Sequence, residues 1–259
     1  MIKKFQFIFR YIKYWFKAKQ TSNSPFISVL ISDVIKNNKH FYAFEEIEGI
    51  RSDLKNNRST INITDFGAGS RINKSNERKI SDVAANSAKA PFLGRIIFKL
   101  INHFQPQNMI ELGTSLGISG CYQIAPNKSA NFTTLEGCPE TAKVAHQVLS
   151  NFKAKNLKIK VGDFAKTLPE VINTYDQLDY VFFDGNHQKK PTLDYFNWCL
   201  PKAHEGTLFI FDDIHWSKGM EEAWEEIKSH PEVTLTVDLF WIGLVFFKKE
   251  KAKKHFLIK

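Results

Sequence analysis

The chain has 259 residues, 43% of them hydrophobic, which is enough to bury one large core. Its net charge of +9 is placed unevenly: residues 1–20 carry +6 and residues 248–259 carry +5, so the interior is slightly acidic. A nucleic-acid enzyme is expected to surround its active site with basic residues, and this distribution therefore argues against a nucleic-acid partner. Three cysteines, Cys121, Cys138 and Cys199, show neither disulfide nor metal-ligand spacing, which predicts a cytoplasmic location.

Residues 2–19 place apolar and aromatic side chains at helical spacing, with basic residues largely on the other side. The apolar set is Phe5, Ile8, Phe9, Ile12, Trp15 and Phe16, and the basic set is Lys3, Arg10, Lys13 and Lys17. The apolar runs are too short for a signal peptide or a membrane span. Two interpretations stay open. The helix packs on the catalytic domain or on a second subunit in a homodimer, or it lies in a lipid interface as a peripheral contact at the inner membrane face.

The segment before residue 80 is predicted to be mainly helical, with helices over 26–37 and 42–56. We therefore expect residues 1–80 to form a helical N-terminal region that caps the substrate site or builds a dimer. Residues 81–259 then form the main domain. A glycine-containing turn at 65–70 is followed by three basic residues, Arg71, Lys74 and Arg78. These form either an anion-binding nest or a turn with solvated charges.

From residue 108 onward, apolar runs and helical patterns alternate regularly. Strands are predicted at 108–112, 132–136, 157–162, 178–184, 207–212, 233–239 and 241–248. Helices connect the first six strands, whereas the last two are nearly adjacent and indicate an antiparallel hairpin at the sheet edge. The predicted fold class is α/β, a Rossmann-like seven-stranded, mostly parallel sheet with helices on both faces and an antiparallel C-terminal hairpin.

The first of these strands runs into a glycine-rich turn that predicts a cofactor site. Gly113 and Gly117 remove side chains where a ligand must approach the backbone, and Thr114 and Ser115 supply hydroxyls and cap the next helix. Glu136 ends the second strand, where a carboxylate lies beside ribose hydroxyls in nucleotide-binding folds. The Gly-x-x-x-Gly spacing lacks the tight pyrophosphate cradle of nicotinamide enzymes, so a cofactor without a pyrophosphate fits better.

These residues resemble class I S-adenosylmethionine-dependent methyltransferases, over roughly residues 81–249. Residues 111–119 are similar to the first motif of that class, Glu136 to its ribose-binding acid, and residues 161–164 to its adenine-side motif. The resemblance implies that S-adenosyl-L-methionine is the cofactor. The residues that it assigns to the cofactor are Glu111, Gly113, Thr114, Ser115, Gly117, Ser119, Glu136, Gly137, Asp163, Phe164 and Asp184.

Carboxylates and imidazoles follow the fourth and fifth predicted strands, whose carboxyl ends meet at one edge of the sheet. Asp184-Gly-Asn-His187 follows the fourth strand, and Asp212-Asp-Ile-His-Trp216 follows the fifth. Such oxygen-rich clusters suit Mg²⁺ or another divalent cation. The arrangement resembles the catechol O-methyltransferase-like branch, which implies Asp184, Asp212 and Asp213 as metal ligands. Asp213 replaces the asparagine of that branch.

Methyl transfer requires alignment of the acceptor and a group that removes its proton. His187 stands where the catechol O-methyltransferase-like branch has its lysine base, and we expect it to act as the base. His215 is an alternative base or an acceptor-orienting group, and Asp212 is the catalytic carboxylate. Other interpretations stay open: Asp212 caps the next helix, His215 stacks with Trp216, or the carboxylates serve only cofactor geometry.

The predicted function is S-adenosylmethionine-dependent O-methylation (EC 2.1.1.-) of a small-molecule or lipid-linked hydroxyl, with divalent-metal assistance as an open question. A nucleic-acid or protein amino-methyltransferase would usually carry an Asn/Asp-Pro-Pro-aromatic stretch after the fourth strand, and residues 184–187 contain no proline. The alternatives are a catalytically divergent or metal-dependent hydroxylase-like relative and a membrane-associated binding module, because one fold serves many functions.

Overall fold

The computed structural model describes residues 2–64, 76–249 and 252–259. The glycine-containing turn at 65–70, with Arg71 and Lys74, lies outside the described residues, so the anion-nest hypothesis stays a prediction. The main sheet contains β3 (Asn108–Leu112), β4 (Asn131–Glu136), β5 (Asn156–Val161), β6 (Tyr180–Phe183), β7 (Leu208–Asp212), β8 (Leu235–Asp238), β9 (Ile242–Phe246) and β10 (Lys254–Leu257). Their order across the sheet is β10-β8-β9-β7-β6-β3-β4-β5.

The Rossmann-like sheet expected from the sequence is confirmed, and an eighth strand extends it. Strands β5, β4, β3, β6 and β7 are mutually parallel, and β9 runs antiparallel to both β7 and β8. The predicted hairpin is therefore β8–β9. The sheet edge next to it belongs to β10, which pairs parallel to β8.

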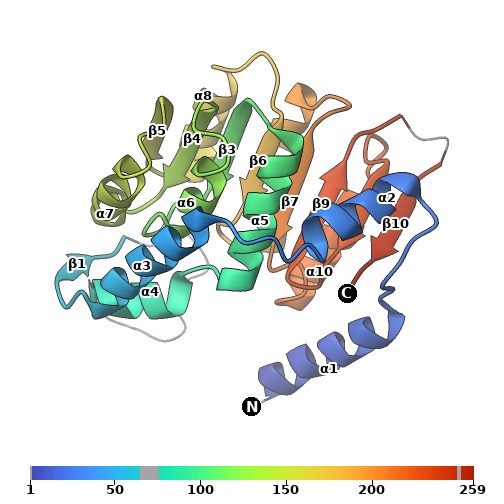
Figure 1. Ribbon diagram of the computed structural model, residues 1–259, viewed down its shortest axis with the longest axis horizontal. Coiled ribbons are helices and arrows are strands. Elements are labelled where there is room, and N and C mark those ends of the chain that lie inside the picture. The colour runs from blue at the N-terminus through green and yellow to red at the C-terminus, as the bar shows by residue number, and fades with distance from the viewer. Residues whose placement is uncertain (1, 65–75, 250–251) are drawn as a thin grey trace.

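Helices cover both faces of the sheet, as Figure 1 shows. They are α5 (Pro91–Phe104), α6 (Ile118–Ile124), α7 (Pro139–Ser150), α8 (Phe164–Ile172), α9 (Lys189–Cys199) and α10 (Lys218–Ser229). Successive strand residues point to opposite faces, so Met109 packs in the hydrophobic layer of α5–α7 and Ile110 in that of α8–α10. The central strands are buried on both faces, which explains why they read as continuous apolar runs.

The N-terminal region contains α1 (Ile2–Lys17), α2 (Pro25–Leu30), a π-helical turn at Ile31–Ile35, α3 (Tyr42–Asn56) and α4 (Ile80–Ser87). A two-stranded antiparallel sheet of β1 (Thr60–Asn62) and β2 (Glu77–Lys79) interrupts the expected run of helices. Side chains of α2 and α3 join the same hydrophobic core as the sheet. A boundary at residue 80 stays a prediction. Within the described ranges, none of the helices is both long and apolar enough to cross a membrane.

Helix α1 packs on the rest of the chain, but not through the residues predicted from the sequence. Tyr14 and Ala18 are buried against Phe240, while Phe9 and Phe16 stay exposed. The helix carries two apolar faces, and only one of them is covered by the described residues.

Candidate active site

The glycine turn after β3 is shaped by a close approach of two strand ends. Gly113 has φ of 98°, and a Cβ there would collide with the carbonyl oxygen of Asp184 after β6. The backbone N–H groups of Gly113 and Thr114 both donate to the carbonyl of Leu135, at 2.9 and 3.1 Å. These bonds tie the turn to the end of β4. Gly117, with φ of 87°, then starts α6.

The acid at the end of β4 is held in place by backbone donors. Glu136 Oε2 accepts from the N–H of Ser115 at 2.7 Å, and Oε1 accepts from the N–H of Cys138 at 2.9 Å. Gly137 follows it in the chain. The structure therefore fixes a half-buried carboxylate beside the glycine turn, at the position where the sequence predicts a ribose contact.

Asp163 and Phe164 stand on the same edge of the sheet, after β5. Asp163 caps α8 by accepting from the N–H of Ala165 at 3.0 Å. The Phe164 ring contacts Tyr195 at 6.0 Å between centroids, and it fills the space that a Cβ of Gly185 would need. The predicted adenine side of the cofactor site is thus a half-buried carboxylate next to an aromatic ring.

One predicted cofactor residue, Glu111, lies beneath the turn, whereas two others, Thr114 and Ser119, line a small cavity beside it. Glu111 is fully buried, and its carboxylate accepts from Gln123 Nε2 at 2.5 Å and from Thr134 Oγ1 at 2.7 Å. Burial raises the pKa of Glu111. Thr114, also fully buried, places its hydroxyl 2.5 Å from that of Thr134, and Ser119 is 6% exposed. Glu111 and Thr134 therefore support the turn from below, through the Thr114 hydroxyl.

The fourth and fifth strands bring a second cluster to the same edge. One nitrogen or oxygen atom from each of Asp184, His187 and Asp212 lies within 4.8 Å of the others. His187 Nε2 is 3.7 Å from Asp184 Oδ1. Asp213, the third predicted metal ligand, is not part of this group. Its φ is 54°, and its backbone N–H donates to the Trp241 carbonyl at 2.8 Å. Burial, with the nearby Asp212 carboxylate, raises its pKa to about 7.

The sequence reasoning missed one residue of this cluster, Lys89. Its Nζ donates to Asp184 Oδ1 at 3.0 Å and forms an ion pair with Asp212 Oδ2, and its side chain is 9% exposed. Lys89 lies between α4 and α5, two residues before Pro91, which is the first residue of α5. In the sequence, Lys89 is marked only as a single lysine before a largely apolar helix, which does not indicate a role in the site.

Burial and Lys89 together set the charges in this cluster. Burial raises the pKa of Asp184 well above its ordinary value, and the Asp212 carboxylate adds to that effect. Burial alone would also raise the pKa of Asp212, but the Lys89 ammonium, a hydrogen bond with Asp184 and the His187 ring together hold this pKa below the ordinary value. Burial, reinforced by Lys89, lowers the pKa of His187, so its imidazole is neutral near pH 7. The cluster thus places one ammonium against two carboxyl groups, of which Asp212 is the more acidic.

His215 has different surroundings from the predicted ones. Its Nε2 lies 2.8 Å from Asp238 Oδ2, and its Nδ1 lies 3.3 Å from Glu221 Oε1. Its ring stacks on Phe240 at 5.2 Å, rather than on Trp216. Although burial opposes the charge, the two carboxylates raise the pKa of His215. Because both ring nitrogens face carboxylates, this imidazole is poorly placed to take a proton from an acceptor.

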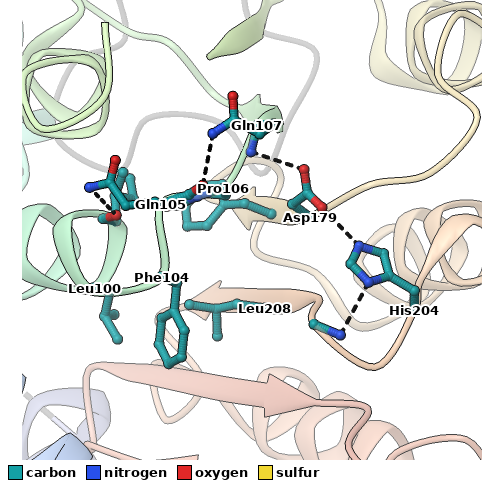
Figure 2. A pocket seen from close by; sticks show the side chains of 11 residues that line it. Leu100, Phe104, Gln105, Pro106, Gln107, Asp179, His204 and Leu208 are labelled. Carbon is teal, nitrogen blue, oxygen red and sulfur yellow. Dashed lines mark hydrogen bonds and ion pairs between the residues drawn. The ribbon is translucent and has the colours of Figure 1, made fainter. Parts of the chain in front are cut away.

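Two cavities lie at opposite ends of the strands. The larger, about 200 Å³, is lined by residues such as Phe104, Gln107, Asp179 and His204 (Figure 2), at the amino ends of β3, β6 and β7. There, Asp179 Oδ1 lies 2.8 Å from His204 Nε2, and Asp179 Oδ2 accepts a hydrogen bond from the backbone N–H of Gln107 at 2.9 Å. The smaller cavity, at the carboxyl ends, is lined by the glycine turn, Asp184, Lys89 and the two residues before Lys89. Open α/β sheets bind ligands at the carboxyl ends, so the smaller cavity marks the site.

The chain is similar to known methyltransferases in sequence and in fold. Residues 110–214 match a family model described as "Methyltransferase domain". A curated catechol O-methyltransferase of Niastella koreensis is 29% identical over 128 residues, which cover 48% of this chain and 57% of the relative. The chain thus aligns with little more than half the length of that relative.

Solved structures share the fold. An O-methyltransferase from Bacillus cereus in complex with S-adenosylhomocysteine has a TM-score of 0.57 and 18% identity, covering 82% of this chain and 93% of the other. A Podospora anserina methyltransferase bound to S-adenosylhomocysteine has a TM-score of 0.61 and 12% identity, covering 90% of this chain and 100% of the other. Residues 110–214 thus match a methyltransferase domain, and the chain shares its fold with solved methyltransferase structures. These matches bear out the resemblance to the catechol O-methyltransferase-like branch of class I methyltransferases that the sequence indicated.

Proposed function

We propose that the protein transfers the methyl group of S-adenosylmethionine to a hydroxyl oxygen, with His187 as the base and Lys89 as the resident cation of the site. The observation that carries this proposal is the meeting of His187, Lys89 and two carboxylates at the strand edge that also holds the glycine turn. The acceptor is a small-molecule or lipid-linked hydroxyl, in line with the oxygen acceptors in the names of the relatives.

The side chains at the strand edge fit the cofactor. Glu136 presents a fixed carboxylate for the ribose hydroxyls, and Asp163 with Phe164 supplies an acceptor and a ring for the adenine. The cavity beside Gly113 and Ser115 leads to Asp184 and Lys89, where the methionine part would end. When bound, S-adenosylmethionine supplies a methyl group on an already activated sulfonium, so the protein has mainly to align the acceptor and remove its proton.

A divalent metal does not fit the same arrangement. Magnesium retains several waters and needs near-octahedral space, but the Lys89 ammonium already lies between Asp184 and Asp212. Both carboxylates are nearly buried, which leaves little room for those waters. Among the described residues, Asp212 Oδ1 is a buried oxygen without a hydrogen-bond partner, and one such oxygen is too few for a second cation beside an ammonium. We therefore derive no step through a metal.

The residues of the cluster suffice for the proton transfer. The neutral imidazole of His187 can accept the acceptor's proton at Nε2, which lies 3.7 Å from Asp184 Oδ1 and is therefore not hydrogen-bonded to it. The Lys89 ammonium stabilises the negative charge that develops on the acceptor oxygen, because it is a fixed charge among largely buried side chains. Asp212 balances that ammonium and keeps it in place. Asp213 and His215 take no part in this proton transfer, and their hydrogen bonds to Trp241 and Asp238 position the loop after β7.

The test is transfer of labelled methyl from S-adenosylmethionine to a panel of catechols, phenols, sugar hydroxyls and lipid extracts, in excess EDTA. We expect methylated product without added metal. His187→Gln should lose about 100-fold or more in kcat, while the affinity for S-adenosylhomocysteine stays unchanged. The matched control is His146→Gln, on the exposed side of α7. Full activity in His187→Gln would show that His187 is not the base. Activity that is lost in EDTA and restored by Mg²⁺ would contradict the role proposed for Lys89.

A further inference from the structure

Helix α1 is clamped onto the edge of the methyltransferase domain through one side. Tyr14 donates its hydroxyl to the carbonyl of Asp238 at 3.1 Å and also bonds the Ile258 carbonyl. Arg10 Nε pairs with Glu221 Oε2 at 2.8 Å, on α10. The Phe7 ring contacts Phe240 at 5.3 Å. These contacts fix the orientation of the helix, so its opposite side points away from the domain.

That opposite side is apolar and exposed. Its residues are Ile8, Phe9, Ile12, Trp15 and Phe16, which we call the outer face of α1. At about 100° per residue they share an arc of about 120°. Phe9 is 69% exposed and Phe16 77%. Isolated exposed apolar residues are ordinary, but a contiguous patch on one helix marks a surface that binds something.

Basic residues border the outer face. Lys13 and Lys17 are exposed on the neighbouring side of the helix, and residues 1–20 contain no acid. The basic C-terminus comes to the same place, as Figure 1 shows, because Lys19 forms a bridge with Ile258. Lys259 Nζ bonds the Trp15 carbonyl at 2.9 Å and lies 3.8 Å from the centre of the Trp15 ring. Lys259 therefore joins Lys13, Lys17 and Lys19 in one cationic border of the outer face.

We propose that the outer face of α1, with Lys13, Lys17, Lys19 and Lys259 around it, binds the surface of an anionic membrane. Aromatic and aliphatic side chains enter the boundary between headgroups and acyl chains, while lysines meet lipid phosphates. A second copy of the chain is a poorer occupant, since a twofold contact through this face would bring two sets of lysines together. The contacts of Phe7, Arg10 and Tyr14 already hold α1 in this orientation, so membrane binding requires no rearrangement.

The membrane surface would lie close to the site. Phe7 contacts Trp216 at 5.8 Å and Trp241 at 5.3 Å. The backbone of each of these tryptophans is hydrogen-bonded to Asp213, next to the carboxylate cluster. A protein bound through α1 would thus hold the loop after β7 near the lipid, where an acceptor carried by a lipid would be found. Membrane binding itself does not depend on the proposed catalytic activity.

The test is partitioning of the full-length protein onto sedimented vesicles. Two compositions are compared: phosphatidylcholine alone, and phosphatidylcholine with about one third phosphatidylglycerol. We expect binding to the anionic vesicles, weakened by salt. Phe9→Gln with Phe16→Gln should lower it at least about tenfold, since each side chain loses its apolar contact with lipid. The control is Tyr42→Gln, which removes an exposed ring on α3.

The charge contribution is tested separately. Lys13→Gln with Lys17→Gln should lower binding to anionic vesicles by about fivefold per charge. Lys143→Gln with Lys166→Gln, which removes two exposed lysines on α7 and α8, should not. Equal partitioning of wild type and the Phe9/Phe16 variant would overturn the proposal. The proposal would also be overturned if the wild-type protein did not bind anionic vesicles but formed a dimer in solution, and the Phe9/Phe16 variant were a monomer.

Discussion

Replacing Lys89 with methionine should destabilise the protein strongly, because Lys89 is the counter-charge of a buried carboxylate. The substitution keeps much of the side-chain volume but leaves Asp212, which is 3% exposed, without its ion pair. Removing one partner of a buried pair costs about 3–5 kcal/mol. For a chain of this size, that loss lowers Tm by about 6–20 °C. The loss should shrink as the pH falls, because the unpaired Asp212 can then take up a proton and lose its buried charge.

Thermal unfolding of wild type and variant between pH 4 and pH 8 measures this effect. The matched control is Lys99→Met on α5, a lysine that is 7% exposed and donates to the carbonyl of Asn37 at 3.0 Å. That variant should lose only about 1 kcal/mol. Equal losses in the two variants, or a Lys89→Met loss that does not change with pH, would refute the charge assignment in the cluster.

Two further predictions concern the glycine turn and pH. Gly113→Ala should cost at least about 2 kcal/mol in urea unfolding, because its φ of 98° and the Asp184 carbonyl both oppose a Cβ. Gly49→Ala, on α3 with open space around it, should be neutral or stabilising, and a similar loss in both would contradict the argument. The pKa of His215 is raised in the folded state, so its stabilising contribution is full below about pH 6.5 and is lost as pH rises through the raised value. The Tm difference between wild type and His215→Gln should therefore shrink from pH 6 to pH 9, and a constant difference would contradict the ion pairs with Asp238 and Glu221.

The sheet and the glycine turn could be predicted because their signals are local. An apolar run of five or six residues ending in an acid and a glycine specifies a buried strand and its exit, whatever surrounds it. The order of such runs then fixed which side chains would share the carboxyl edge, and Asp184, His187 and Asp212 do meet there.

The parts that the sequence did not reveal depend on contacts between distant residues. Strand β10 has only four residues, and its pairing with β8 is not visible in a half-charged segment. Lys89 reaches carboxylates about 95 and 123 positions away in the chain, and no spacing rule connects them. Helix α1 carries two apolar arcs. The periodicity of the sequence points to the outer face, whereas the packing contacts are made by Phe7, Tyr14 and Ala18 on the other arc.

The central claim is that the strand edge binds S-adenosylmethionine without a metal. Calorimetric titration with S-adenosylhomocysteine, in EDTA and then in Mg²⁺, tests it most directly, with Glu136→Gln as the site variant and Glu170→Gln on α8 as the control. We expect micromolar binding in EDTA, unchanged by Mg²⁺ and by the control substitution, and weakened about 10- to 100-fold in Glu136→Gln through loss of a charged hydrogen-bond acceptor. Absence of binding, or binding that appears only with Mg²⁺, would contradict it.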